Sequence, residues 1–328
     1  MMSSIIPEGK APGRGGLSGQ VAVVTGGGSG VGRAVAKALA RQGANVVVAD
    51  FDASRMDRTV EEIIQLGSSD AALALATDVR NDASVRSLAR DSIKAMGRVD
   101  ILVNAAGVLL QGKLDRISIR DWNWMLETNL LGAVRTATAF LPHMIQRGSG
   151  HMINTVSFGG LLPGDALAIP YDSGHAALAA FTAGLAQETR GTGIFVSLYC
   201  PGSKGPRIGQ NTRSRGMGRW LRRSDLADEG SHTLEQLAAS LIDGLHHPRF
   251  LILGDPKDAA LLKSRWDQPD TPSQGGAPGA GSATPDAVRQ GGAPGAGSAR
   301  PGALRGEVPP QKDVPPPTER QDVVSKPQ

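Results

Sequence analysis

Short apolar runs alternate along this chain with stretches that have helical spacing. The first run, Val21–Thr25, is followed by glycines and a predicted helix, Val31–Arg41, and another helix is expected from the N-cap Asp82 to Gly97. The runs are apolar at successive positions, which is typical of parallel strands covered on both faces. Repeated strand–helix units predict an α/β, doubly wound parallel sheet in a single domain. Further predicted strands are Asn45–Asp50, Leu73–Thr77, Ile101–Val103, Met152–Val156, Ile194–Tyr199 and Phe250–Leu253.

Composition divides the chain into three parts. Residues 1–16 are polar and rich in Gly and Pro, which predicts a flexible lead-in, and residues 17–262 carry the strand–helix pattern. Residues 263–328 are dominated by Pro, Gly, Ala and Ser, and the segment Gln274–Ala283 is repeated letter for letter at Gln290–Ala299. This last part has too few large apolar side chains to offset the chain entropy by burial, so we expect a disordered tail.

Charge and cysteine content exclude some classes of protein and weaken others. The formal net charge is only +4, which gives little reason to expect a nucleic-acid partner. The chain has one cysteine, Cys200, so it cannot form an internal disulfide, and no run is long and apolar enough for a signal peptide or a membrane span. The six histidines show no metal-ligand spacing. We therefore expect a cytoplasmic protein without a metal or a membrane partner.

A glycine-rich turn between the first strand and its helix carries the clearest functional signal. The sequence TGGGSGVG places Gly26, Gly30 and Gly32 where a backbone can approach a pyrophosphate at a helix N-terminus, as in Rossmann-like domains. Asp50 ends the second strand and can accept hydrogen bonds from both ribose hydroxyls of NAD. Arg55 could reach a 2′-phosphate, so NADP remains the alternative cofactor.

Several ordered motifs resemble those of the short-chain dehydrogenase/reductase family, over roughly residues 17–260. The resemblance rests on the glycine turn, on Asp78 in TDV, on NAAG at residues 104–107, on TNLLGA, on a Ser and a Tyr, and on a Pro-Gly after the sixth strand. It implies a soluble homo-oligomer, dimer or tetramer, that exchanges hydride between a nicotinamide cofactor and a small carbonyl or alcohol. The implied cofactor-binding residues are Thr25, Gly26, Ser29, Gly30, Val31, Gly32, Asp50, Asp78, Val79, Asn104, Ala105, Gly107, Tyr171, His175, Pro201 and Gly202.

The same resemblance implies roles for four catalytic positions. Tyr171 would be the general acid/base, Ser157 would hold the substrate oxygen, and Asn129 would support a water chain. The fourth position departs from the family, whose pattern is Tyr-x-x-x-Lys, because His175 stands where the lysine is expected. Lysine supplies a fixed charge that stabilises the tyrosinate, whereas histidine is mostly neutral at pH 7.

A second departure follows Pro201-Gly202, where Pro206 replaces a threonine that contacts the cofactor in the family. Proline has neither a hydroxyl nor an N–H to donate. Lys204 could partly replace the missing charge, although a loop lysine is usually only solvated. Two hypotheses result: a slow NAD-dependent oxidoreductase, or an inactive NAD-binding pseudoenzyme that acts as a sensor or scaffold.

Two further groups of residues bear on the substrate. Several arginines cluster around Trp220, where the family has a lid, and they could capture an anion or simply form a solvated basic segment. By the same resemblance, four leucines lie in loops that line the substrate cleft and suggest an apolar substrate. The arginines are Arg213, Arg215, Arg219, Arg222 and Arg223, and the leucines are Leu109, Leu110, Leu161 and Leu162.

Overall fold

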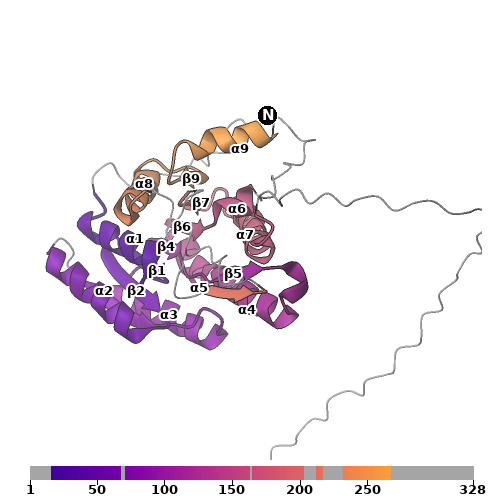
Figure 1. The fold of residues 1–328 in the computed structure, drawn as a ribbon. Helices are drawn as coiled ribbons and strands as arrows, with labels where there is room; N and C mark the ends of the chain where they lie inside the picture. The colour runs from indigo at the N-terminus through magenta and orange to yellow at the C-terminus, as the bar shows by residue number, and fades with distance from the viewer. Residues whose placement is uncertain (1–15, 68–70, 163–164, 203–211, 217–231, 267–328) are drawn as a thin grey trace, which may run out of the picture. The chain divides into compact units, whose positions relative to one another are not determined.

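The computed structural model describes residues 16–67, 71–162, 165–202, 212–216 and 232–266. At its centre lies a seven-stranded sheet in the order β3-β2-β1-β4-β6-β7-β9 (Figure 1), and every neighbouring pair in it is parallel. The chain reverses direction across the sheet between β1 and β4, which makes this the topological switch point of a doubly wound fold. The strands are β1 Val21–Thr25, β2 Asn45–Asp50, β3 Ala72–Ala76, β4 Ile101–Asn104, β6 Gly150–Thr155, β7 Ile194–Cys200 and β9 Leu251–Leu253.

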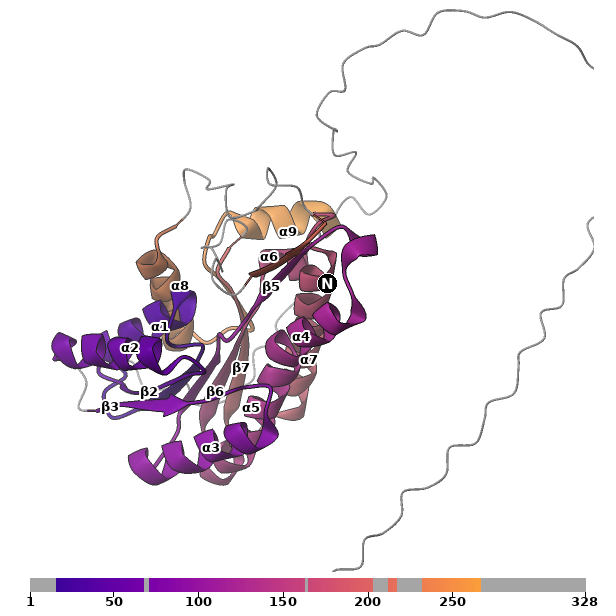
Figure 2. The same ribbon diagram turned by 60° about the horizontal axis from the view of Figure 1, so that its bottom comes forward.

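Two helical layers cover the sheet, and Figure 2 shows the sheet between them. One layer packs on the face that carries Val24 and Val48, and the other packs on the face that carries Val23 and Val47. Because both faces are covered, strands β1 and β4 are buried at every position. The first layer is α1 Gly30–Arg41, α2 Ala53–Leu66 and α8 Leu234–His246, and the second is α3 Asp82–Met96, α5 Leu131–Arg147 and α7 Ile169–Glu188.

The predicted fold class is confirmed, with shifts of one or two residues at the ends of elements. The third strand, for example, ends at Ala76 instead of Thr77. Asn81 caps helix α3, because its side chain accepts a hydrogen bond from the Ser84 amide, whereas Asp82 is already the first helical residue. The prediction that Asp82 is the cap was therefore wrong by one position.

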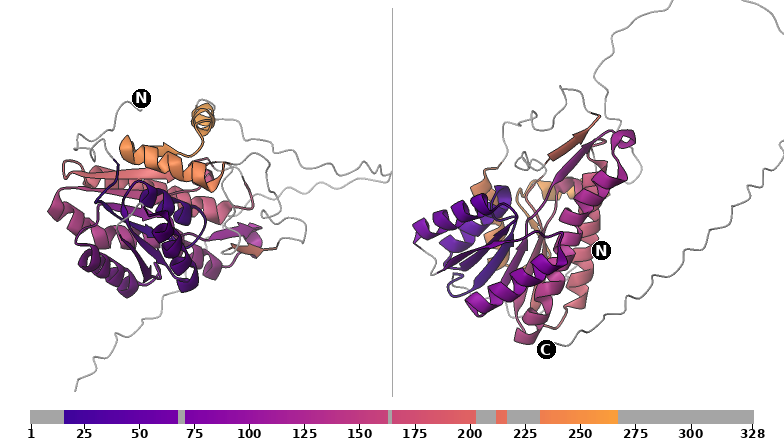
Figure 3. Two further views of the ribbon diagram at one scale, coloured as in Figure 1. Left: turned by 90° about the vertical axis from the view of Figure 1, so that its left-hand side faces the viewer. Right: turned by 90° about the horizontal axis from the view of Figure 1, so that it is seen from below.

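Several elements at the carboxyl end of the sheet were not predicted. Strands β5 and β8 pair in parallel as a separate two-stranded sheet, which lies beyond the carboxyl end of the main sheet (Figures 2 and 3). The last helix reaches Trp266, four residues past the expected end of the domain at 262. The further elements are β5 Leu109–Gly112, the 3₁₀ turn Leu114–Arg116, α4 Ile119–Asn129, α6 Phe158–Leu161, β8 Thr212–Arg215 and α9 Asp258–Trp266.

Some predictions fall outside the described residues. These are the flexible lead-in at residues 1–15, the tail at residues 267–328, and the positions Lys204, Pro206, Arg219, Trp220, Arg222 and Arg223. Among the helices that the structure describes, none combines the length and the apolar character that crossing a membrane requires.

A histidine lies inside the sheet core, on β6. The ring of His151 is fully buried, its Nε2 lies 2.8 Å from Ser197 Oγ, and burial lowers its pKa from 6.5 to about 4. The folded protein therefore holds this imidazole neutral over a pH range in which the unfolded chain protonates it.

This buried histidine predicts a loss of stability in mild acid. Because the pKa is lower in the folded state, the contribution is fully present above pH 6.5 and is lost as the pH falls towards about 4. The slope should approach about 1.4 kcal/mol per pH unit for one proton. Urea unfolding at several pH values should give a shallower slope for His151→Gln than for the native chain. His246→Gln, at the end of helix α8, is the matched control, and equal slopes for the native chain and His151→Gln would contradict the prediction.

Candidate functional site

The glycine turn after β1 is shaped first by packing within the protein. A Cβ atom on Gly26 would lie 2.7 Å from the Ala106 backbone, and one on Gly32 would lie 2.3 Å from the Gly26 carbonyl oxygen. Gly30 has a φ of +51°, and a Cβ there would meet nothing within 4 Å. Two motif glycines are thus required by the fold, while the third faces open space where a ligand has room.

Helix α1 begins in this turn without a side-chain cap. Its N-cap residue Ser29 makes no side-chain hydrogen bond to the first turn, whereas α2, α3, α4 and α8 are each capped by a side chain. The first amides of a helix have no partner within the helix and carry its positive dipole end. The backbone from Gly30 through Val31 to Gly32 therefore fits a pyrophosphate group.

Asp50, at the end of β2, is held in a fixed orientation beside the turn. Its carboxylate accepts hydrogen bonds from the Gly28 amide at 3.0 Å and from the Asp52 amide at 3.1 Å, and the residue is buried. A carboxylate has about four acceptor positions, so two remain for ribose hydroxyls. Arg55, the candidate for a 2′-phosphate, forms an ion pair with Asp52 at 3.0 Å.

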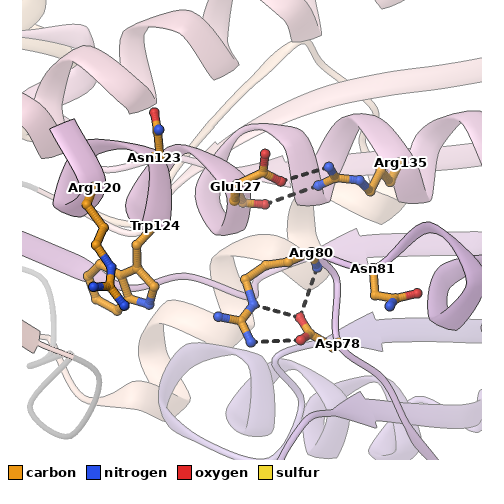
Figure 4. A pocket seen from close by; sticks show the side chains of 8 residues that line it. All are labelled: Asp78, Arg80, Asn81, Arg120, Asn123, Trp124, Glu127 and Arg135. Atoms are coloured by element: carbon orange, nitrogen blue, oxygen red, sulfur yellow. Dashed lines mark hydrogen bonds and ion pairs between the residues drawn. The ribbon is translucent and has the colours of Figure 1, made fainter. Parts of the chain in front are cut away.

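Asp78, expected at the adenine, is paired with an arginine that the sequence analysis did not consider. The Arg80 side chain donates to both of its carboxylate oxygens at 2.9 and 2.7 Å (Figure 4), and these bonds lower the pKa of Asp78. The pair lines a hollow of about 530 Å³ between the end of β3 and helix α4. Val79, the next residue, is buried against Gly132.

Asn104 lies at the end of β4, and its side chain holds the sheet together. Its amide nitrogen donates to Asn154 Oδ1 at 2.9 Å, and its amide oxygen accepts from Thr136 Oγ at 2.7 Å, with all three residues buried. The Ala105 amide donates to the Thr25 carbonyl at 3.2 Å, which continues the pairing of β4 with β1. Asn104 and Thr25 thus shape the carboxyl edge of β4 and β1 through buried bonds.

Tyr171 and His175 lie together on helix α7, as their spacing of four residues predicted. Their rings meet edge to face, with centroids 4.4 Å apart, and both residues are buried. Burial lowers the pKa of His175 from 6.5 to about 4, so its imidazole is neutral at pH 7. The structure therefore brings His175 to the tyrosine without the charge that lysine would carry.

Asn129, at the end of α4, contacts the ring of His175. The Val108 amide donates to Asn129 Oδ1 at 2.8 Å, and Asn129 Nδ2 donates to the Val108 carbonyl at 2.9 Å, which defines the orientation of the side-chain amide. That same Nδ2 lies 3.5 Å from His175 Nε2. Because Nδ2 can only donate, this long contact favours the tautomer in which Nε2 accepts and the imidazole proton is on Nδ1. This Nδ1 is buried and has no hydrogen-bond partner among the described residues.

Ser157 begins helix α6, which packs directly on α7. Its Oγ accepts a hydrogen bond from the Gly159 amide at 3.3 Å. A Cβ on Gly159 would lie 2.1 Å from Asp172 Oδ1, and a Cβ on Gly160 would lie 2.5 Å from the His175 Cβ. The two glycines allow this close contact, which carries Ser157 to the start of α7, where Tyr171 lies.

The remaining predicted cofactor residues lie at the ends of β4 and β7. Gly107 lies next to Asn129, and Pro201 follows β7 and is buried against Gly254. Gly202 has a φ of +140°, which only glycine adopts readily, so the chain leaves the sheet there by a turn that needs this residue.

One expectation about the substrate is wrong, and one of two alternatives is disfavoured. Arg213 and Arg215, for which an anion site and a solvated segment were both open, form ion pairs with Asp121 on α4, at 3.4 and 2.8 Å. Leu110 is fully buried against Met125, so it cannot contact a substrate. Leu109, Leu161 and Leu162 remain partly buried candidates for an apolar wall.

Sequence reasoning missed the residues that support the site from neighbouring elements. Asn154, Thr136 and Gly160 gave no local signal, because their partners are distant in the chain. Asp121 had one available signal, since Ser118-x-x-Asp121 has the spacing of a helix N-cap box, and the structure confirms the cap. Among the described residues, no group of His, Cys, Asp or Glu could hold a metal ion.

Comparison with known proteins gives consistent matches. The family model described as short chain dehydrogenase matches residues 20–215. An uncharacterized oxidoreductase of Staphylococcus aureus is 35% identical over 186 residues, which cover 57% of this chain and 78% of that protein. The (2S)-[(R)-hydroxy(phenyl)methyl]succinyl-CoA dehydrogenase subunit BbsD of Thauera aromatica is 36% identical over 187 residues, which cover 57% of this chain and 74% of that protein. A short chain dehydrogenase/reductase of Burkholderia phymatum, solved with NAD, has a TM-score of 0.68 and 29% identity, covering 77% of this chain and 95% of that one.

The buried bonds of Asn104 predict that its loss destabilises the fold. Asn104→Ala leaves Asn154 Oδ1 without its donor and opens a small cavity, which together should cost about 3 kcal/mol of unfolding free energy. Urea denaturation checks this value against Asn123→Ala, a substitution at an exposed position of α4. A cost below about 1 kcal/mol would show that the network contributes little.

Proposed function

The chain belongs to the short chain dehydrogenase family, and we propose that it transfers hydride between NAD(H) and the carbonyl or secondary alcohol of a small, apolar substrate. The observation that carries the proposal is the cluster of Tyr171, His175 and Asn129. It lies at the carboxyl end of the parallel sheet, where ligands bind in open α/β folds. The proposed reaction is slow, because the positive charge expected beside the tyrosine is absent.

Residues around β1 and β2 would hold the cofactor. The uncapped amides of α1 would bind its pyrophosphate, and Asp50 would accept from the hydroxyls of the adenine ribose. The open space before Gly30 and the two backbone bonds that orient Asp50 both fit this group. When bound, the nicotinamide would donate or accept the hydride. Thr25, Ser29, Asp78, Val79, Asn104, Ala105, Gly107, Pro201 and Gly202 would form or support the rest of this surface.

Residues on α7 and its neighbouring elements would carry out the proton transfer. Tyr171 would donate a proton to the substrate oxygen during reduction, or accept one during oxidation, while Ser157 would hold that oxygen. Neutral His175 would keep the tyrosine ring in place and bond to Asn129, but it would not stabilise a tyrosinate.

The size and polarity of the substrate are proposed from the same edge of the sheet. Leu109, Leu161 and Leu162 are partly buried there and offer apolar surface. The Thauera aromatica relative is named for a succinyl-CoA substrate that carries a secondary alcohol beside a phenyl group, which agrees with the proposed reacting group but is neither small nor apolar as a whole. A dimer or tetramer stays a prediction from the family resemblance, and a cytoplasmic location stays a prediction from the composition of the chain.

A second candidate function is favoured by the neutral state of His175. A chain that binds NAD but lacks the activating charge could act as a sensor or scaffold. Fluorescence titration with NADH, followed by turnover assays on a panel of ketones and alcohols, distinguishes the two functions. Turnover of any member that is abolished by Tyr171→Phe supports the oxidoreductase. Tight binding without turnover supports the pseudoenzyme.

The orientation of Asp50 predicts a preference for NADH over NADPH. A fixed carboxylate accepts from ribose hydroxyls and repels a 2′-phosphate, so we expect at least about tenfold tighter binding of NADH. Side-by-side fluorescence titrations measure the ratio. Asp50→Ser should reduce it strongly, while Asp57→Asn on the exposed face of α2 should not. Equal affinity of the native protein for both cofactors would show that a basic residue dominates.

Restoring the charge at position 175 should activate Tyr171. His175→Lys places an ammonium one helical turn from the phenol. We expect turnover at pH 7 to 8 to rise within the roughly 10²- to 10⁴-fold range that general acid–base catalysis contributes to a rate. His175→Gln can still accept from Asn129 but carries no charge, so it should not raise turnover.

A second readout of the same change needs no substrate. The chain has two tyrosines, and burial raises the pKa of Tyr199 well above its usual range, so the tyrosinate absorbance that is lost in Tyr171→Phe should report Tyr171. It should appear at lower pH in His175→Lys than in the native chain.

A native enzyme that turns over substrate faster than the lysine variant would contradict the turnover prediction, because catalysis would then depend on the histidine itself.

A further inference from the structure

Strands β5 and β8 bring two distant segments together beside the candidate site. They pair in register, with Leu110 opposite Arg213 and Gln111 opposite Ser214. Because paired residues share a face of a sheet, Leu110, Arg213 and Arg215 lie on one face and Leu109, Gln111 and Ser214 lie on the other. The first face contacts α4, where Leu110 is buried against Met125. On the other face, Gln111 Nε2 donates to Ser214 Oγ at 3.1 Å.

Strand β5 is bonded at both ends to the elements that carry the candidate catalytic residues. Val108, directly before β5, exchanges two hydrogen bonds with Asn129, the residue that contacts His175. At the other end, the Gly112 amide donates to the Leu167 carbonyl at 2.7 Å, just before helix α7 and Tyr171. A displacement of β5 would therefore shift residues on both sides of the Tyr171–His175 pair.

Strand β8 is connected to α4 through a single buried carboxylate. Arg215 donates to both oxygens of Asp121, at 2.9 and 2.8 Å, and Ser118 Oγ donates to it at 2.9 Å. Arg213 adds a weaker bond to Asp121 at 3.4 Å, and its guanidinium carbon lies 3.8 Å from the centroid of the Trp124 ring. Both arginines thus face α4, on the side opposite to Gln111 and Ser214.

The strength of this contact depends on the burial of Asp121. Its side chain is 7% exposed, whereas those of Arg213 and Arg215 are 37% and 43% exposed. A buried charge requires a paired partner, while a half-exposed guanidinium is solvated even when it is unpaired. The bonds from Arg215 hold the pKa of Asp121 far below its usual range, so the carboxylate stays ionised at neutral pH.

We propose that Asp121 is a positioning residue for substrate binding: by holding Arg213 and Arg215 against α4, it fixes β8 on β5, and with it the part-buried side chains of Leu109 and Ser214, which the buried Gln111 supports from the same face. This inference rests on the proposed function. The carbonyl substrate would bind against that face while the reacting groups stay on α7 and α6. Loss of the carboxylate should then weaken substrate binding and leave the proton chemistry largely intact.

Hydrogen exchange and steady-state kinetics on the full chain test the proposal. Asp121→Asn keeps the shape of the side chain and removes its charge. Arg215→Gln removes the partner of Asp121 by a substitution at a half-exposed position. Asp91→Asn, which breaks an exposed ion pair on α3, is the matched control. Exchange is followed by mass spectrometry on peptides that contain residues 109–112 and 212–215. Kinetics use cyclohexanone and acetophenone with NADH, and fluorescence titration gives the Kd of NADH.

In both Asp121→Asn and Arg215→Gln we expect the backbone amides of residues 212–215 to exchange about tenfold faster, which corresponds to the loss of one charge-assisted hydrogen bond. KM for the ketone should rise about fivefold or more, while kcat and the Kd of NADH change less than about twofold. Unchanged exchange, or faster exchange with an unchanged KM, overturns the proposal, and so does a loss confined to kcat. If neither ketone is turned over by the native chain, the proposed function fails and the role in substrate binding fails with it, while unchanged exchange separately overturns the claim that Asp121 fixes β8 on β5.

Discussion

The contact between the buried imidazole of His175 and its neighbours determines the geometry of the candidate site. Helix α6 can approach only because Gly160 has no side chain where the His175 Cβ lies, and Tyr171 meets the ring edge to face. Asn129 bonds to Nε2 and thereby connects α4 and the residue before β5 to the same ring. Three helices and one strand are positioned around a group that burial keeps uncharged.

The parallel sheet explains why residues far apart in the chain reach this place. Every strand of the main sheet ends at the same edge, so the glycine turn, Asp50, Asn104 and Ser157 gather there after four different strands. The buried bonds from Asn104 to Asn154 and Thr136 join β4 to β6 and α5 just below that edge. Rigid support under an open surface is the arrangement that ligand binding requires.

The sequence predicted those parts of the fold that follow from local patterns. Apolar runs such as Val21–Thr25 identified the buried strands, and the glycine spacing identified the turn that fits a pyrophosphate. The spacing of Tyr171 and His175 placed both on one helix face. The two-stranded sheet was missed because β5 and β8 are short, and because Arg215 and Asp121 are 94 residues apart. For the same reason the sequence left Arg213 and Arg215 as either an anion site or a solvated segment, since a charged side chain reveals nothing about a buried partner on another element. The burial that neutralises His175 also depends on long-range packing.

The protonation state of His175 tests the account most directly. Carbon-13 NMR of histidine-labelled protein, with the His175 signal assigned by its loss in His175→Gln, gives the titration midpoint of this ring. The account predicts an imidazole that stays neutral on the Nδ1–H tautomer through neutral pH, with a pKa of about 4. A midpoint at or above about 6.5, the value of an unperturbed histidine, would contradict it, because His175 could then supply the charge that the family lysine carries.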